Sequence, residues 1–107
     1  MRIRTTSIAD ADVAESALFL EQTQPGLGST FLDAVDATFA SIVAAPLACP
    51  TIVLPDIKFK FPLRFKQVDR FPYRVIFTVV TDEAAVVSVL HSNRDLEFIL
   101  RARVGVS

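Results

Sequence analysis

Residues that build the commonest active and metal sites are scarce in this 107-residue chain, which has one cysteine, one histidine and three glycines. The single Cys49 excludes an internal disulfide, and with His91 it supplies too few ligands for a typical zinc site. Gly26 and Gly28 separate two helical patterns instead of following a strand, so they do not form a phosphate-binding loop. We therefore expect no metal and no cofactor, and we expect Cys49 to be a small apolar residue packed near a loop.

Long apolar runs are also missing. No run approaches the roughly 20 residues of a membrane span, although 51% of the residues are hydrophobic. The segment Met1–Arg4 leads into a polar helix start and not into the apolar core of a signal peptide. We expect a cytoplasmic protein without a membrane partner, folded as a single domain over residues 1–107.

Charge is distributed unevenly along the chain, whose net charge is −1. Residues 1–57 hold two basic and seven acidic side chains, whereas residues 58–107 hold nine basic and five acidic ones. The basic half favours an anionic partner, or the two halves complement each other within the fold. An isoelectric point near 5.7 is too low for a dedicated nucleic-acid-binding protein.

We predict that the segment Arg70–His91 forms the centre of the fold. Its first part, up to Val80, is rich in β-branched and aromatic residues, the types that fit a pleated sheet. Thr81, Asp82 and Glu83 interrupt it, and a second apolar run follows. We predict two strands joined by this acidic turn.

Two helices are predicted before that segment, after a short strand at residues 2–6. The first begins with Ser7 as N-cap, and its small inner face consists of alanines and Leu18. Residues 24–28 form a turn, and Ser29 or Thr30 caps the second helix, which ends at Pro46. The apolar stripe of the second helix comprises Phe31, Leu32, Val35, Phe39, Ile42 and Val43, and the first helix turns Ala11, Ala14 and Ala17 inward.

Four prolines in residues 46–62 predict a connecting loop with at most one edge strand, at Ile57–Phe61. Leu63–Asp69 alternates weakly, with Leu63, Phe65 and Val68 inward, and is the natural antiparallel partner of the next strand. The tail from Leu96 is expected to form one or two helical turns before Gly105. The order of elements predicts an α+β fold.

Six side chains near the predicted strands are candidates for chemistry: Arg64, Lys66, Tyr73, Arg74, His91 and Arg94. Arginine stabilises phosphate charge, histidine transfers protons near neutral pH and tyrosine stacks on a base, a set that suits metal-free RNA cleavage. Structural roles compete with these. In these roles, Arg74 forms an ion pair with Asp69 or Asp95, and His91 makes a structural hydrogen bond. Tyr73 has the inward parity of Phe71 and Val75 and would belong to the core. A Ser–His–Asp triad is disfavoured, because Ser88 and Ser92 do not face His91.

At these residues the chain resembles the RelE/ParE superfamily of bacterial toxins, in its ParE-like or plasmid-stabilisation branch. Four segments carry the resemblance over nearly the whole chain: the helix with Asp10–Glu21, the link from Gln24 to Val35, the Phe-Pro-Tyr-Arg segment Phe71–Arg74 with its strand, and Val89–Asp95 with its Leu-His-x-x-Arg-Asp pattern. The resemblance implies a β-α-α-β-β-β fold, with a helical hairpin packed on a small antiparallel sheet. It also implies a type II toxin that forms a hetero-oligomer with a cognate antitoxin, whose extended or helical segment wraps over the helices and the sheet.

Two activities compete within this superfamily. A ParE-like toxin binds and inhibits DNA gyrase without being a nuclease. A RelE-like toxin is a metal-free endoribonuclease that cleaves messenger RNA on the ribosome; Arg74 would then stabilise the phosphate and His91 would act as acid or base. Arg64, Lys66, Tyr73 and Arg94 are the residues expected to bind the nucleic acid or the target.

The acidic isoelectric point, the lysine-poor helices and the position of Tyr73 upstream of His91 disfavour the nuclease. We therefore expect gyrase inhibition. The third alternative is a chain that keeps the fold and binds an antitoxin but has lost its toxicity.

Overall fold

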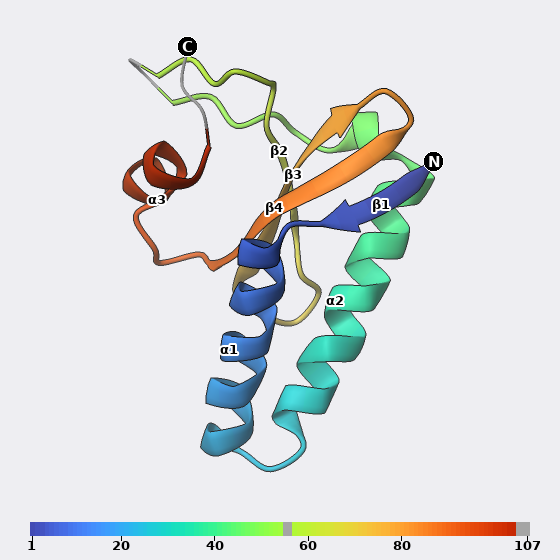
Figure 1. Cartoon of the computed structure of the whole chain (residues 1–107). Coiled ribbons are helices and arrows are strands. Elements are labelled where there is room, and N and C mark those ends of the chain that lie inside the picture. Colours follow the sequence, from blue (N-terminus) through green and yellow to red (C-terminus); the bar gives the residue numbers. More distant parts are fainter. Residues whose placement is uncertain (55–56, 105–107) are drawn as a thin grey trace.

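The computed structural model describes residues 1–54 and 57–104 (Figure 1). Pro55, in the predicted loop, and Gly105, the predicted end of the last helix, lie outside the described residues. The elements are β1 (Arg2–Thr5), α1 (Ser7–Thr23), α2 (Leu27–Ala44), the short 3₁₀ helix η1 (Pro46–Ala48), β2 (Arg64–Gln67), β3 (Tyr73–Val80), β4 (Glu83–His91) and α3 (Leu96–Arg103). This order confirms the predicted α+β fold.

The sheet has the strand order β1-β4-β3-β2. The predicted central hairpin is confirmed: β3 and β4 are antiparallel, and Val80 pairs with Glu83 across the turn. The sheet differs from the expected antiparallel one in a single pairing, since β1 pairs in parallel with β4 and the sheet is mixed. Parallel pairing requires a long crossover, which the helical hairpin and the two following strands provide.

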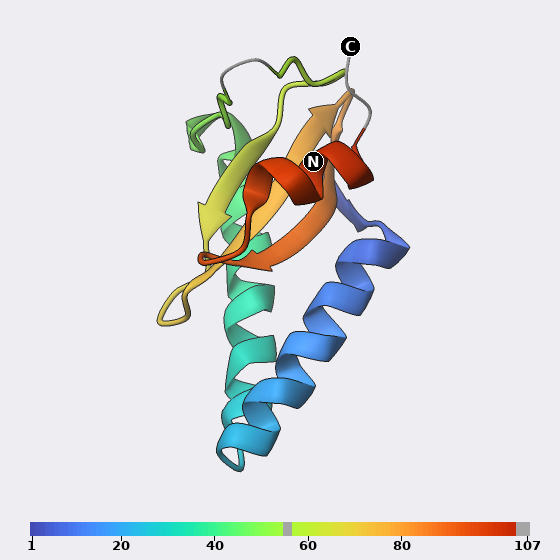
Figure 2. The same cartoon turned by 90° about the vertical axis from the view of Figure 1, so that its left-hand side faces the viewer.

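The two faces of the sheet are covered differently. The α1–α2 hairpin packs on one face, where Phe31, Val35 and Ile42 of α2 join Val75 and Phe77 of β3 in the larger core. A smaller core on the other face holds Leu63, Ile76, Leu90, Ile99 and Leu100. Figure 2 shows α3 crossing that second face, with α2 behind the sheet. The sheet is therefore buried on both sides.

The first helix, α1, differs from its prediction in its N-cap and in its buried side. The N-cap is Thr6 and not Ser7, since the Thr6 hydroxyl accepts a hydrogen bond from the Ala9 N–H at 3.1 Å. Of the predicted inner face, only Ala17 packs against the core, whereas Ala11, Ala14 and Leu18 are exposed. Small apolar residues lie all around this helix, so their spacing alone did not define its buried side.

The start of α2 also differs from the prediction. Gly26, with φ at +88°, occupies the N-cap position, and neither Ser29 nor Thr30 caps the helix. The Glu21 carboxylate at the end of α1 instead accepts hydrogen bonds from the N–H groups of Gly26 (2.9 Å) and Gly28 (3.0 Å). The first turn of α2 is thus capped from outside the helix, which local sequence does not reveal.

The apolar stripe of α2 is largely as predicted, and α2 ends at Ala44, just before Pro46. Phe31, Val35 and Ile42 are buried, while Leu32 remains 42% exposed. By length and composition alone α2 could cross a membrane. Its contacts in the larger core explain its apolar character, since an amphipathic core helix passes the same test.

The loop before β2 does not form the predicted strand at Ile57–Phe61, where only Phe59 is a bridge residue. Thr51 forms the bridge to Arg64 instead, flanked by hydrogen bonds from the Ile52 N–H to the Leu63 carbonyl and from the Phe65 N–H to the Pro50 carbonyl. This short pairing covers part of the edge of β2. Cys49, just before it, is buried as predicted.

Candidate functional site

Tyr73 and His91 are brought together by the register of the central hairpin. They are paired residues of β3 and β4, and their rings meet edge to face with centroids 5.1 Å apart. Tyr73 is buried, as its inward parity predicted, and its ring also lies 4.9 Å from that of Phe31 on α2. The pair therefore lies on the face of the sheet that the helical hairpin covers.

A cavity of about 300 Å³ opens beside this pair, between α1 and the ends of β3 and β4. Arg94, in the turn after β4, reaches the same cavity, so three of the six candidate residues meet here. The wall from α1 adds side chains that sequence reasoning did not select as site residues: Asp12, Glu15, Ser16 and Phe19. The cavity thus combines cationic, acidic and aromatic groups.

The hydrogen bonding of His91 limits its chemistry. Its Nδ1 accepts a hydrogen bond from the Asn93 N–H at 3.0 Å. A neutral imidazole that accepts at Nδ1 carries its proton on Nε2. In this tautomer Nε2 is a donor and the lone pair of Nδ1 is engaged by the Asn93 N–H, so neither nitrogen is free to act as a general base.

Asp12 joins three elements behind the cavity. Its Oδ2 accepts hydrogen bonds from the Val89 N–H of β4 at 3.0 Å and from Arg103 Nη1 of α3 at 2.6 Å. The same Arg103 nitrogen donates to the Ser88 hydroxyl at 3.2 Å. The Asp12 side chain is only 9% exposed. Because the partners are 91 residues apart, no local pattern in the sequence predicts this ion pair.

Arg74 lies on the opposite face of the sheet from Tyr73 and His91. It pairs in register with Leu90, and its guanidinium stacks on the Phe65 ring, 5.2 Å from the centroid. Neither predicted ion pair forms, since Asp69 lies near Arg70 and Asp95 caps α3. The buried Nε of Arg74 has no hydrogen-bond partner among the described residues.

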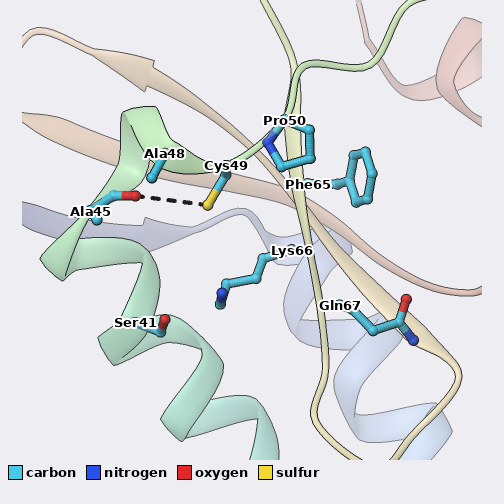
Figure 3. A pocket seen from close by; sticks show the side chains of 8 residues that line it. All are labelled: Ser41, Ala45, Ala48, Cys49, Pro50, Phe65, Lys66 and Gln67. Carbon is cyan, nitrogen blue, oxygen red and sulfur yellow. Dashed lines mark hydrogen bonds between the residues drawn. The ribbon is translucent and has the colours of Figure 1, made fainter.

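Arg64 and Lys66 form a third, separate group on β2. Arg64 Nη1 donates to the Cys49 carbonyl at 2.6 Å, which fixes the end of η1 to the strand. Lys66 extends from β2 toward α2 (Figure 3). The six candidates therefore occupy three places: the Tyr73–His91–Arg94 cavity, the Arg64–Lys66 side of β2, and Arg74 on the other face.

Within residues 1–54 and 57–104, no group of three or more histidine, cysteine, aspartate or glutamate side chains is arranged to hold a metal ion. What the cavity offers is hydrogen bonding, an aromatic wall and charge of both signs. These are features of a surface that recognises another molecule.

Comparison with known proteins assigns the chain to a family. The family model described as "ParE toxin of type II toxin-antitoxin system, parDE" matches residues 3–96. A chain of the chromosomal ParDE toxin–antitoxin system from P. aeruginosa has the same fold, with a TM-score of 0.59 and 20% sequence identity over 85% of this chain and 95% of that one. No curated protein matches the sequence. The predicted superfamily is confirmed, and the chain belongs to the ParE toxin family of type II toxin–antitoxin systems.

Proposed function

We propose that this protein is a cytoplasmic toxin that binds and inhibits DNA gyrase and is neutralised by a cognate antitoxin. The proposal extends the family assignment, which concerns the toxin class, to a target and a partner. One observation favours gyrase over messenger RNA: the two residues that a RelE-like nuclease would use, Arg74 and His91, lie on opposite faces of the sheet. Arg74 pairs with Leu90, whereas His91 pairs with Tyr73.

Cleavage of a phosphodiester requires its acid, base and charge-stabilising groups around the same phosphate. Side chains on opposite faces of a strand pair cannot meet there. The occupied Nδ1 of His91 further reduces its capacity as a base. A protein that acts by binding needs none of this alignment, and so the geometry supports a binding toxin.

The helical hairpin offers the surface on which an antitoxin helix would dock. A groove of about 500 Å³ runs between α1 and α2, with Val13, Ala17, Leu32 and Phe39 among its lining residues. Leu18 of α1, next to Ala17 in the chain, is 61% exposed. Helical walls present no free backbone groups, so a helix, which satisfies its own hydrogen bonds, fits this groove better than an extended chain.

A supercoiling assay with purified gyrase tests the target. We expect the purified protein to inhibit supercoiling of relaxed plasmid and to leave translation of a reporter messenger RNA unchanged. Ribosome-dependent cleavage of that messenger RNA, lost in Arg74→Ala or His91→Ala, would establish the nuclease instead.

Expression in a bacterial host tests toxicity. We expect growth arrest without an antitoxin and recovery when the antitoxin is co-expressed. Normal growth at confirmed soluble expression would identify the chain as the non-toxic relic of the fold.

A further inference from the structure

The cavity beside Tyr73 and His91 contains polar groups that the fold itself leaves without partners. Tyr73 is only 6% exposed, and its hydroxyl has no hydrogen-bond partner among the described residues. The hydroxyl is not sealed in the core, because Arg74 Nε is the one fully buried side-chain atom without a partner in the part of the chain that the structure describes. It therefore opens into the space that Tyr73 lines, which is this cavity.

Charged side chains of opposite sign lie on two walls of the cavity. Arg94 belongs to the turn after β4, and Glu15 lies on α1. Neither forms an ion pair within residues 1–54 and 57–104, so both are available to a ligand. Glu15 and the neighbouring Asp12 would repel a simple anion, and Arg94 would repel a simple cation. A matching ligand carries an anionic group at one end and hydrogen-bond donors at the other.

The α1 wall also offers a flat apolar surface. Phe19 lines the cavity although it is 63% exposed. An exposed aromatic ring beside polar groups is a platform on which a planar ring can stack. Ser16 adds a second hydroxyl that has no hydrogen-bond partner among the residues described. The cavity thus combines a stacking surface, hydroxyls, carboxylate and guanidinium.

We infer that this cavity binds a free ribonucleoside monophosphate. The base stacks on Phe19, the Glu15 carboxylate accepts hydrogen bonds from the ribose hydroxyls, and the Arg94 guanidinium donates to the phosphate. The Tyr73 hydroxyl gains the hydrogen-bond partner that the fold does not supply. A volume of about 300 Å³ is in the range of small-molecule sites.

A single nucleotide fits this cavity better than an RNA chain. Arg94 is the one arginine or lysine among the lining residues, whereas a polynucleotide backbone is bound by several cations. The α1 helix contains four acidic side chains and no basic one, so it would repel further phosphates. Arg74, which a RelE-like nuclease would use, lies on the opposite face of the sheet. The site is therefore distinct from an RNA-cleaving arrangement.

The cavity is also separate from the hairpin groove. Glu15, Ser16 and Phe19 line the cavity, whereas Val13 and Ala17 line the groove. A nucleotide and an antitoxin helix would thus contact different residues of α1. Since the nucleotide needs neither the antitoxin nor gyrase to bind, the inference goes beyond the proposed function.

Calorimetric titration of the full chain with adenosine 5′-monophosphate tests the site. We expect this nucleotide to bind about tenfold more tightly than adenosine, which lacks the phosphate, and than its 2′,3′-dideoxy analogue, which lacks the hydroxyls. Inorganic phosphate alone should not bind. The chain has one tyrosine and one histidine, so their ring-proton NMR signals identify Tyr73 and His91 directly. Both signals should shift during the titration.

Two substitutions separate the contacts. Arg94→Gln should weaken binding of the monophosphate about tenfold and leave adenosine binding unchanged. Glu15→Ala should reduce the affinity for the monophosphate to that of the dideoxy analogue and leave the analogue unaffected. The matched control is Arg2→Gln, at an exposed residue that does not line the cavity, and it should bind like the wild type. Melting curves establish that all three variants are folded.

Several results would overturn the inference. On the wild type these are no binding of the monophosphate at millimolar concentration, unshifted Tyr73 and His91 signals, or equal binding of inorganic phosphate. Tighter binding of an oligoribonucleotide would indicate an RNA site, and tighter binding of phenylalanine would indicate a zwitterion site. Equal losses in Arg94→Gln and Arg2→Gln would also contradict it. If the protein does not inhibit gyrase, the proposed function fails, while the titration still decides whether the cavity binds a nucleotide.

Discussion

The two faces of the sheet are stabilised by very different amounts of structure. On the hairpin face, α1 and α2 contribute 17 and 18 residues and interlock with the strands through large side chains such as Phe31 and Ile42. On the other face, α3 has 8 residues and contacts the sheet mainly through Ile99 and Leu100. An isolated helix of this length is unstable in water, so α3 depends on its docking, whereas the hairpin forms the body of the fold.

The family match follows the same division. It covers residues 3–96 and stops at the first residue of α3. The shared pattern thus belongs to the hairpin and the sheet. The remaining helix is attached to them by a small apolar patch and by the ion pair between Arg103 and Asp12. We therefore expect a destabilising substitution on the hairpin face to unfold the whole protein. A destabilising substitution on the other face should only detach α3 from the sheet.

The largest effect is expected from Val75→Asp on the hairpin face. Val75 is fully buried in the larger core, and an unpaired carboxylate there costs several kcal/mol. That is a large share of the roughly 5–15 kcal/mol that stabilises a typical domain. We expect no cooperative melting transition by circular dichroism. Val53→Asp, at a position 82% exposed, is the control and should melt like the wild type.

A smaller loss is expected from Gly28→Ala, which tests how closely the two helices of the hairpin must approach. A Cβ at this position would lie 2.6 Å from the Ala17 carbonyl oxygen, a backbone atom that cannot move aside alone. We expect the free energy of unfolding in urea to fall by about 2–3 kcal/mol. Gly26→Ala meets no neighbour within 4 Å, and its strain from φ at +88° should cost about 1 kcal/mol. Equal losses would contradict the close-approach argument.

The sequence was sufficient to predict the hairpin face and its strands because the relevant patterns are strong. The continuous β-branched run in β3, the glycines around Pro25 and the phenylalanines of α2 each favour one structure. It was insufficient for α1, whose alanines fit any side of a helix, and for the start of α2, which is capped by Glu21 from another helix. Tertiary contacts determine both the buried side of α1 and the start of α2.

The candidate site was predicted in part for similar reasons. Antiparallel neighbours were expected to share a surface, and Tyr73 and His91 do. Arg74 was grouped with them, although the alternation of side chains along a strand places residues 73 and 74 on opposite faces. No sequence pattern indicates the Asp12–Arg103 ion pair, because Asp12 has the position of an ordinary acidic residue near a helix N-terminus.

Removal of the Asp12–Arg103 ion pair should destabilise the α3 face of the sheet and leave the hairpin face unchanged. In Arg103→Ala, the Val89 N–H is the one partner that the Asp12 carboxylate keeps among the described residues, in a largely buried position. We expect the free energy of local opening of α3 to fall by about 1–2 kcal/mol, measured as faster hydrogen exchange confined to the amides of α3. Arg101→Ala is the matched control, because Arg101 pairs with Glu97 at the surface, where such pairs contribute about 0.5 kcal/mol or less. Equally faster exchange in the hairpin would show that the two faces unfold together.

The smallest effect is expected at the rim between the faces, where Arg70 connects β2 to β3 with φ at +72°. Its side chain is 80% exposed, and its ion pair with Asp69 is long, at 3.9 Å, and surrounded by solvent, so the pair contributes little to stability. Arg70→Gly removes the cost of a left-handed conformation and should stabilise the protein by about 0.5 kcal/mol. Asp69→Gly, at a neighbouring residue without a positive φ, should instead be slightly destabilising. Because the rim belongs to neither face, Arg70→Gly should slow the globally unfolding amides of the hairpin and the sheet while leaving the local opening of α3 unchanged.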